Sequence, residues 1–337
     1  MESNSEEYIS CEFLQSGLNL QNDFVSSCNF ITNGLIFYDF SNKSMSERGI
    51  RNIDFDEIKK KREDLIKNRE IPKNCEGCFN LKKRKWNFRH KISYLTMDHW
   101  RNCNCGCIYC SNRGHENVEF LTEEVTHSQF YDVLPLIEKL KDNDYFDEKV
   151  VIQTIGGEPA NLEEYPKIIQ KLLELEDENL SKTEIGMLTS GIKYVPEIAM
   201  ALEKPDKYLT ISLDCGTRKT YIKIKHKDSF DECISNIQEY IRHAKYKFQV
   251  ILKYILLPNI NDNKEEIDKF FEIVRKVGCK QVNFSLEFCH GLMHKQGQKI
   301  PENLYELFDY AEKKAKEYEI IFQVFDIVKD LLKKGHY

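Results

Sequence analysis

The sequence lacks the features that would direct it to a membrane or to nucleic acid. Its 337 residues contain no apolar run as long as the ~18 residues that a membrane-spanning helix needs. Positive charge is not in excess, because 49 lysines and arginines stand against 55 aspartates and glutamates, which argues against a nucleic-acid partner. Residues 1–10 are acidic and polar, so we expect neither a secretory signal nor a transit peptide, and we expect a cytoplasmic protein.

Internal repeats and low-complexity segments are absent as well, and 41% hydrophobic with 31% charged residues is the composition of a globular protein. Cysteine, by contrast, is plentiful, with 12 residues. In a cytoplasmic chain of this size, cysteines are more often metal ligands or redox groups than disulfides. Such close clustering favours a metal or iron–sulfur site over a disulfide scaffold. Eight of them lie in the first third of the chain: Cys11, Cys28, Cys75, Cys78, Cys103, Cys105, Cys107 and Cys110.

From residue 91 onward, short apolar runs alternate with segments of helical periodicity, which predicts an α/β fold with a parallel sheet. Six strand–helix units would form a partial (βα)6 TIM-like barrel, and we place it at residues 86–337. Residues 1–85 read as a small α+β domain with short strands at 16–25 and 34–40 and a charged helix at 54–68. The basic stretch 81–91 reads as a solvated linker, and a binding site for RNA or an anionic substrate, with Trp86, Phe88 and His90 interleaved, is the alternative. The strands expected in the barrel are 92–97, 150–155, 184–189, 208–214, 248–256 and 281–287, with a possible seventh at 320–324.

The first cysteine motif lies in residues 103–110, which read Cys-Asn-Cys-Gly-Cys-Ile-Tyr-Cys. Within it, Cys103, Cys107 and Cys110 have the spacing Cys-x3-Cys-x2-Cys. Three thiolates on one tight loop can each hold one iron of a four-iron cluster, which leaves the fourth iron open to a small molecule. The alternative is a structural zinc ion that also uses Cys105, although zinc ligands usually come as two separated pairs.

A second motif follows the next predicted strand, where residues 151–155 run directly into Gly156-Gly157-Glu158-Pro159. With the Cys-x3-Cys-x2-Cys loop and the aromatic Tyr109 before its last cysteine, this segment resembles the radical S-adenosylmethionine (radical SAM) superfamily. The resemblance covers about residues 91–290, and its two motifs occur in the expected order on the expected elements.

This resemblance implies an iron–sulfur enzyme of oxidoreductase type that carries a [4Fe-4S] cluster and binds S-adenosylmethionine. Reductive cleavage of the cofactor would give a 5′-deoxyadenosyl radical, which abstracts a hydrogen atom from the substrate. Gly156 and Gly157 would let the backbone approach the methionyl group, with Pro159 completing the segment. Glu158 would accept a hydrogen bond from the methionyl amine. A flavodoxin or a ferredoxin is the expected electron donor.

Further cofactor contacts are implied by position along the resemblance. Tyr109 would lie near the adenine, and Ser190 would contact the cofactor from the end of the third strand. Ser212 and Asp214, at the end of the fourth strand, would meet the ribose. For these two residues an ordinary strand end is the alternative. Lys253 points to the barrel interior or to solvent, and the alternation of side chains alone does not decide which.

The remaining early cysteines, Cys11, Cys28, Cys75 and Cys78, resemble an N-terminal form of the SPASM-type auxiliary cluster module. Four thiolates would close the coordination of a second [4Fe-4S] cluster. A zinc ion on the same four sulfurs is the alternative. Cys105 belongs to neither set, and it is either a spectator or a replacement for one of the four.

The substrate class is the least defined part of this interpretation. The SPASM-like module favours a peptide or protein substrate, and an epimerase or dehydrogenase acting on a sugar, nucleotide-sugar or other small metabolite is the alternative. A non-catalytic scaffold would leave the glycine-rich motif without a role. Cys215, after the fourth strand, is the preferred hydrogen-atom donor, and Cys289 is a second candidate. Other polar residues expected near the sixth strand end are Glu287, His290 and His294.

Overall fold

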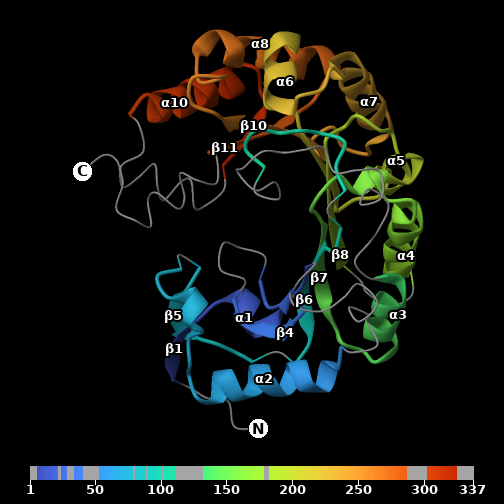
Figure 1. Cartoon of the computed structure of the whole chain (residues 1–337), viewed down its shortest axis with the longest axis vertical. Helices are drawn as coiled ribbons and strands as arrows, with labels where there is room; N and C mark the ends of the chain where they lie inside the picture. The colour runs from blue at the N-terminus through green and yellow to red at the C-terminus, as the bar shows by residue number, and fades with distance from the viewer. Residues whose placement is uncertain are drawn as a thin grey trace. The chain divides into compact units, whose positions relative to one another are not determined.

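The computed structural model describes residues 6–21, 24–28, 34–40, 53–78, 80–88, 90–100, 102–110, 132–177, 182–286 and 302–324. The chain divides into two compact units (Figure 1). The first combines Met1–Asn102 with His127–Gly186, and the second combines Cys103–Thr126 with Met187–Tyr337. The cysteine loop therefore belongs to the second unit and the glycine-rich motif to the first.

The sheet of the first unit has parallel strands at one end and antiparallel strands at the other. Its strand order is β7 (Phe146–Thr154), β6 (Ile92–Asp98), β2 (Gly17–Gln21), β3 (Phe24–Ser26) and β4 (Ile36–Asp39). Strand β6 pairs in parallel with both β7 and β2, whereas β2–β3 and β3–β4 are antiparallel. The N-terminal strands thus extend the sheet that begins with β6.

The helices of the first unit are α1 (Glu12–Ser16), α2 (Phe55–Lys67), α3 (Leu134–Asp142) and α4 (Tyr165–Asp177), with short 3-10 turns η3 (Lys73–Cys75) and η5 (Pro159–Asn161). Helix α2 begins where predicted, because Asp54 caps its first turn by accepting from two backbone amides. Arg62 is buried and donates to the carbonyl oxygen of Gly17, which ties this charged helix to β2. Burial lowers the pKa of Arg62 to about 10.

The basic stretch is part strand, which differs from the linker expected there. Strand β5 (Lys82–Lys85) pairs antiparallel with β1 (Glu7–Ser10). Trp86 explains why this basic stretch forms a strand. Its ring nitrogen donates to the carbonyl oxygen of Tyr8 at 3.0 Å, and the Arg84 guanidinium lies 3.8 Å from its ring centre. One buried aromatic residue therefore holds an otherwise exposed basic strand in place.

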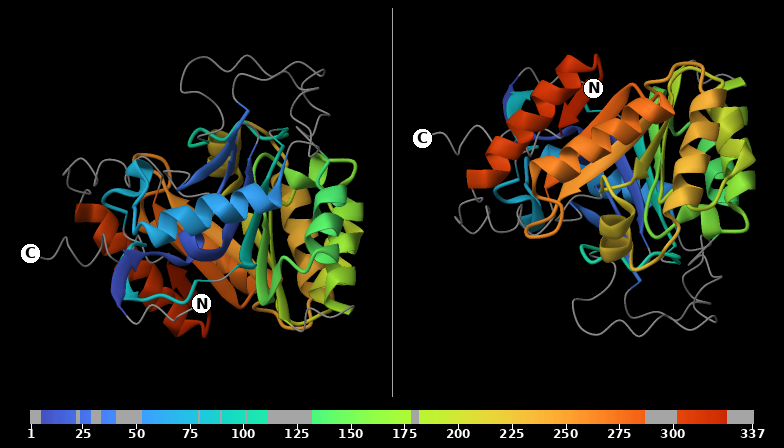
Figure 2. Two further views of the ribbon diagram at one scale, coloured as in Figure 1. Left: turned by 90° about the horizontal axis from the view of Figure 1, so that it is seen from below. Right: turned by 90° about the horizontal axis from the view of Figure 1, so that it is seen from above.

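The second unit is a parallel sheet with helices on one face (Figure 2). Its strands β9 (Lys207–Ser212), β10 (Val250–Leu256), β11 (Gln281–Leu286) and β12 (Ile321–Val324) are adjacent in that order. Residues of β8 (Lys182–Thr189) are divided between the two units. The helices are α5 (Pro196–Leu202), α6 (Arg218–Lys225), α7 (Phe230–His243), α8 (Lys264–Val277) and α10 (Glu302–Glu317).

The core of this unit is aromatic. Tyr254 of β10 stacks on Phe284 of β11 with ring centres 4.9 Å apart, and both rings contact Phe270 of α8. Helix α8 ends at Gly278, whose φ of 78° gives the left-handed cap that is common at helix C-termini. Aromatic rings from two strands and one helix therefore pack together on the face of the sheet toward α8.

The α/β fold with mostly parallel strands is confirmed, and each strand expected from residue 91 onward is present within a few residues. Closure into a partial barrel and the boundary near residue 85 stay predictions. In the described ranges, none of the helices has both the length and the apolar character that crossing a bilayer would demand.

Candidate functional site

The cysteine loop rests on the end of helix α6. The amide of Gly106 donates to the carbonyl oxygen of Lys225 at 2.7 Å, and the amide of Ile108 donates to that of Ile224 at 3.1 Å. The last carbonyls of a helix have no partner within the helix, so these two bonds complete α6 while fixing the loop. His226, in the left-handed conformation with φ of 51°, ends the helix at this point.

A buried group of three side chains fixes the loop a second time. The Tyr109 hydroxyl donates to Oδ2 of Asp214 at 2.5 Å, and Nζ of Lys225 lies 2.6 Å from the same oxygen. Lys225 also donates to the Tyr109 hydroxyl at 3.0 Å. The side chains of Lys225 and Asp214 are only 1% and 0% exposed. Tyr109, Asp214 and Lys225 are called the anchor group below.

The electrostatics of the anchor group follow from this burial. Burial is the largest single influence and disfavours the ammonium, but Asp214, Tyr109 and Cys107 together outweigh it and raise the pKa of Lys225 well above its usual value. Burial, together with the same carboxylate, raises the pKa of Tyr109. The group therefore holds a buried ion pair with a neutral phenol beside it.

Asp214 is itself held on every side. Its Oδ1 accepts from the amide of Ile255 at 3.0 Å, and its carbonyl oxygen accepts from Nδ2 of Asn261 at 2.8 Å. Its φ is 61°, a left-handed conformation that Asp tolerates better than most residues. The anchor group thus links the cysteine loop to the ends of β9 and β10. The contacts of Asp214 and Tyr109 with the cofactor that we expect from sequence stay predictions.

The thiols of the loop interact with one another. Cys105 is buried, its amide donates to the sulfur of Cys103 at 3.4 Å, and its thiol interacts with the sulfur of Cys107. The interaction with Cys105 is the largest influence on Cys107 and, with the positive charge of Lys225, lowers the pKa of Cys107 against the effect of burial. The thiolate is the form that binds iron.

This donor set fits an iron–sulfur cluster. Cys103, Cys107 and Cys110 lie on one eight-residue loop, the amide of Cys110 donates to the carbonyl oxygen of Cys107 at 3.1 Å, and a neighbouring thiol stabilises one thiolate. Over the ranges that the structure describes, no three His, Cys, Asp or Glu side chains converge as they do around a bound metal ion. The sulfur-rich chemistry and the fixed backbone support this role, and Cys103, Cys107 and Cys110 as cluster ligands stay a prediction.

The glycine-rich motif lies in the first unit and is shaped by close packing. Trp100 donates from its ring nitrogen to the carbonyl oxygen of Gly156 at 2.8 Å. Gly156 and Gly157 have φ of 87° and 34°, and a Cβ added at Gly156 would overlap the carboxylate of Asp98. Both its conformation and its surroundings require glycine at position 156.

Glu158 is 1% exposed and begins the short helix η5. Its Oε1 accepts from the amide of Ala160 at 3.1 Å, and its own amide donates to the carbonyl oxygen of Asn102, next to the cysteine loop in sequence, at 2.6 Å. Pro159 takes the first position of η5, where its missing amide costs nothing. The contact of Glu158 with the methionyl amine stays a prediction.

Replacing Gly156 with Ala should lower the free energy of unfolding by about 2–4 kcal/mol, since left-handed strain and overpacking act together. Gly278→Ala is the matched control, because Gly278 has φ of 78° and no neighbour within 4 Å. That control isolates the strain, at about 1–2 kcal/mol. Urea denaturation of both variants measures the difference, and equal losses would contradict the crowding at Gly156.

The remaining predicted residues of the second unit lie at strand ends. Ser190 is 9% exposed, and its carbonyl oxygen accepts from the thiol of Cys233 at 3.4 Å. Ser212 is half-buried at the end of β9. Cys215 is fully buried, and burial raises the pKa of its thiol well above the usual value. Its role as a hydrogen-atom donor stays a prediction.

Two of the four cysteines of the second set, Cys11 and Cys75, lie together in the structure. Cys11 and Cys75 share one buried cluster with Leu14, and Cys11 begins helix α1 by accepting from the amide of Leu14. Burial raises the pKa of Cys11, and Cys78 lies close enough to raise it further. Cys28 follows β3, and its carbonyl oxygen accepts from Asn19. Four further predicted residues lie outside the described residues: Glu287, Cys289, His290 and His294.

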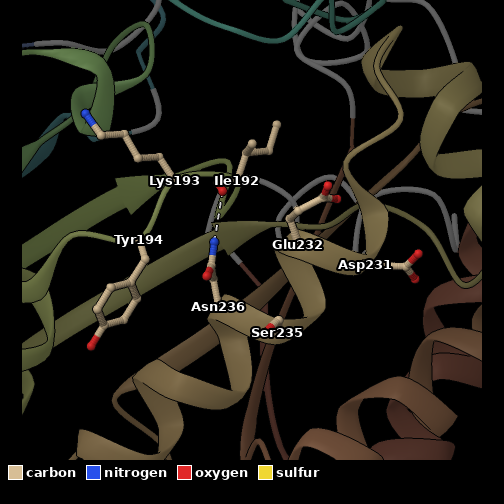
Figure 3. A pocket seen from close by; sticks show the side chains of 7 residues that line it. All are labelled: Ile192, Lys193, Tyr194, Asp231, Glu232, Ser235 and Asn236. Atoms are coloured by element: carbon tan, nitrogen blue, oxygen red, sulfur yellow. Dashed lines mark hydrogen bonds between the residues drawn. The ribbon is translucent and has the colours of Figure 1, made fainter.

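A pocket of about 650 Å³ follows the Thr-Ser-Gly segment at the end of β8 (Figure 3). Asn236 of α7 lies at its wall and donates to the carbonyl oxygen of Ile192 at 2.9 Å. None of the residues predicted from sequence lines this pocket. Its lining is formed by Ile192, Lys193, Tyr194, Asp231, Glu232, Ser235 and Asn236.

Two curated proteins are similar to the chain in sequence. A probable GTP 3′,8-cyclase of Saccharolobus islandicus (strain Y.N.15.51 / Yellowstone #2) is 28% identical over 219 residues, which cover 65% of this chain and 64% of that protein. The dual-specificity RNA methyltransferase RlmN of Buchnera aphidicola is 25% identical over 194 residues, 56% of this chain and 53% of that protein. The chain therefore spans somewhat less than two thirds of these relatives.

Solved structures share the fold. Streptococcus suis SuiB bound to its precursor peptide SuiA has a TM-score of 0.54 at 12% identity, covering 79% of this chain and 52% of that chain. SuiB bound to S-adenosylmethionine has a TM-score of 0.51 at 12% identity, covering 81% and 55%. The family model of the radical SAM superfamily matches residues 97–271, which include both motifs. The chain belongs to the radical SAM superfamily.

Proposed function

We propose that this radical SAM enzyme abstracts a hydrogen atom from a peptide or protein substrate. The proposal is carried by two separate sets of cysteines. One is the anchored Cys-x3-Cys-x2-Cys loop, and in the other Cys11 and Cys75 pack in the same group of buried apolar side chains. The second set resembles the auxiliary module of peptide-modifying radical SAM enzymes.

Each motif has a defined task in this proposal. When bound, the iron–sulfur cluster supplies the electron that splits S-adenosylmethionine and so generates the hydrogen-abstracting radical. Cys103, Cys107 and Cys110 would hold that cluster, and the anchor group keeps their loop in place. Gly156, Gly157 and Glu158 would bind the methionyl part of the cofactor, with Ser190 and Ser212 as further contacts.

The second cysteine set would hold an auxiliary [4Fe-4S] cluster. Cys11, Cys28, Cys75 and Cys78 supply four sulfurs, enough to complete its coordination. Burial of Cys11 and Cys75 keeps water from these sulfurs. Such a cluster suits electron relay, since hydrogen abstraction leaves an unpaired electron on the substrate. A flavodoxin or a ferredoxin would provide the reducing electron.

A small-molecule substrate is the second candidate. Similarity to a probable GTP 3′,8-cyclase over 65% of the chain favours a nucleotide among the metabolites considered. Cys215 would return a hydrogen atom if the product is redox-neutral. Its complete burial means that such transfer needs local opening around the thiol.

Deuterium transfer distinguishes these candidates. The reconstituted enzyme, incubated without oxygen with S-adenosylmethionine and a strong reductant, should form 5′-deoxyadenosine. Deuterated peptides encoded beside its gene should pass deuterium into that product, detected by mass spectrometry, because the radical takes the atom directly from its substrate. Deuterated GTP serves as the parallel arm. Transfer from GTP and from none of the peptides would contradict the peptide proposal.

A further inference from the structure

The parallel sheet of the second unit has two chemically different faces. On β10 the even-numbered residues from Val250 to Leu256 are fully buried, and Tyr254 among them packs on Phe270 of α8. On β11, Phe284 packs on Phe308 of α10 in the same way. Odd-numbered residues of β10 and β11 therefore face away from these helices.

The face away from the helices carries a row of polar side chains. Lys253 of β10 is in register with Ser212 of β9 on one side and with Asn283 of β11 on the other. Asn283 is in register with Gln323 of β12. Residues in register on parallel strands project from the same face, so hydroxyl, ammonium and two amides stand side by side across four strands.

Asn283 is the member of the row that points to a ligand. It is 3% exposed, and its Oδ1 has no hydrogen-bond partner in the part of the chain that the structure describes. A buried polar atom without a partner costs about 1–3 kcal/mol, and a group that donates a hydrogen bond to it would remove that cost. A ligand with an N–H donor would do so.

Lys253 supplies a positive charge beside this amide. It is half-buried, and within the described ranges the only charged groups acting on it are Asp214 and Lys225. The carboxylate of Asp214 is already occupied by Lys225, Tyr109 and the backbone. Burial lowers the pKa of Lys253, as expected for an amine that lacks a carboxylate of its own.

We infer that Lys253 and Asn283, neighbours in this row, form a substrate subsite for an anionic group with an N–H donor beside it. Lys253 would pair with a carboxylate or phosphate oxygen, and Asn283 would accept from the neighbouring N–H. An acidic residue in a peptide has both features, so this inference rests on the proposed function and narrows its substrate class. It places Lys253 on the face of the sheet away from the helices, a choice that the sequence pattern leaves open.

The test is protection of Lys253 from chemical labelling in the reconstituted enzyme with S-adenosylmethionine bound. Acetic anhydride labels accessible amines, and mass spectrometry reports each lysine separately. The probes are N-acetylglutamate α-amide, its uncharged analogue N-acetylglutamine α-amide, and inorganic phosphate. At about ten times its dissociation constant, a bound anion should slow labelling of Lys253 about tenfold. Lys280, exposed beside β11, is the control within the same molecule and should not be protected.

The outcomes distinguish a carboxylate ligand from a phosphoryl ligand. Protection by the glutamate probe alone supports a carboxylate, and protection by phosphate as well supports a phosphoryl group at the same site. Equal protection by the glutamine analogue, or none by either anion, would overturn the inference. In an Asn283→Asp variant, the affinity for the glutamate probe should fall about tenfold, since ~1.4 kcal/mol of repulsion is tenfold in affinity, and protection at the same probe concentration should fall to about twofold. Unchanged protection there would remove Asn283 from the subsite.

The proposed function can fail independently of this subsite. Formation of 5′-deoxyadenosine by the same preparation reports on the radical chemistry without any probe. If that product does not form while Lys253 is still protected by an anion, the proposed function is wrong and the anion subsite stands.

Discussion

Replacing Cys103, Cys107 and Cys110 together with Ala should abolish cleavage of S-adenosylmethionine. These sulfurs are the proposed ligands of the cluster, and their loop is fixed by Gly106 and Ile108 on helix α6. The protein should still fold, because the backbone bonds to α6 do not depend on the sulfurs. Iron should fall from about eight to about four per chain, as one of two four-iron clusters is lost. Product analysis for 5′-deoxyadenosine and iron determination measure both effects.

Cys75→Ala is the matched variant at the other cysteine set. It should also leave about four irons, yet some cleavage of S-adenosylmethionine should persist, because the anchored loop is intact. Cys279→Ala serves as a control for loss of a buried thiol outside both sets. Full cleavage activity in the triple variant would defeat the assignment of the first set. If the unmutated protein contains about four irons per chain together with zinc, the second cysteine set holds a structural zinc ion and not an auxiliary cluster.

Lys225→Met should destabilise the protein by about 3–5 kcal/mol, because it leaves the buried Asp214 carboxylate without its counter-charge. The pair is 2.6 Å apart with both side chains at most 1% exposed, so water does not screen the loss. Denaturant unfolding under anaerobic conditions measures this change. Since Tyr109 shares the same carboxylate oxygen, the cysteine loop should also retain iron less well.

Two further variants test the reason for the loss of stability expected in Lys225→Met. Adding Asp214→Asn to Lys225→Met should recover part of the stability, because the unpaired charge is gone. Lys269→Met breaks an exposed pair with Glu272 at 2.9 Å and should cost only about 0–1 kcal/mol. A loss at Lys225 no larger than that at Lys269 would mean that the anchor group contributes little to the fold.

The strands and the two motifs could be predicted from sequence because they depend on local pattern. Apolar runs at the spacing of strand–helix units mark β6 to β12, and cysteine spacing marks the loop at 103–110. Strand β5 could not be predicted in this way, since its order comes from Trp86, whose ring nitrogen donates to the distant Tyr8. A basic run has no apolar alternation to reveal it.

The anchor group was missed for a related reason. Tyr109 lies 105 positions from Asp214 and 116 positions from Lys225, and hydrogen bonds over such separations leave no trace in local spacing. One signal was available: Tyr221, Ile224 and Lys225 are at i, i+3 and i+4 on helix α6, so the lysine falls on its apolar face. A lysine in that position is rarely buried unless it is paired.

The docking of the cysteine loop on α6 also bears on how the metal group is installed. Fixing the backbone of one residue costs about 1–2 kcal/mol of conformational entropy, and here folding of the polypeptide has already met that cost for Gly106 and Ile108. Iron and sulfide would thus meet a loop whose backbone is already fixed at Gly106 and Ile108, and loading would mainly have to reorient the cysteine side chains, in contrast to small zinc domains that are unstructured until the ion binds.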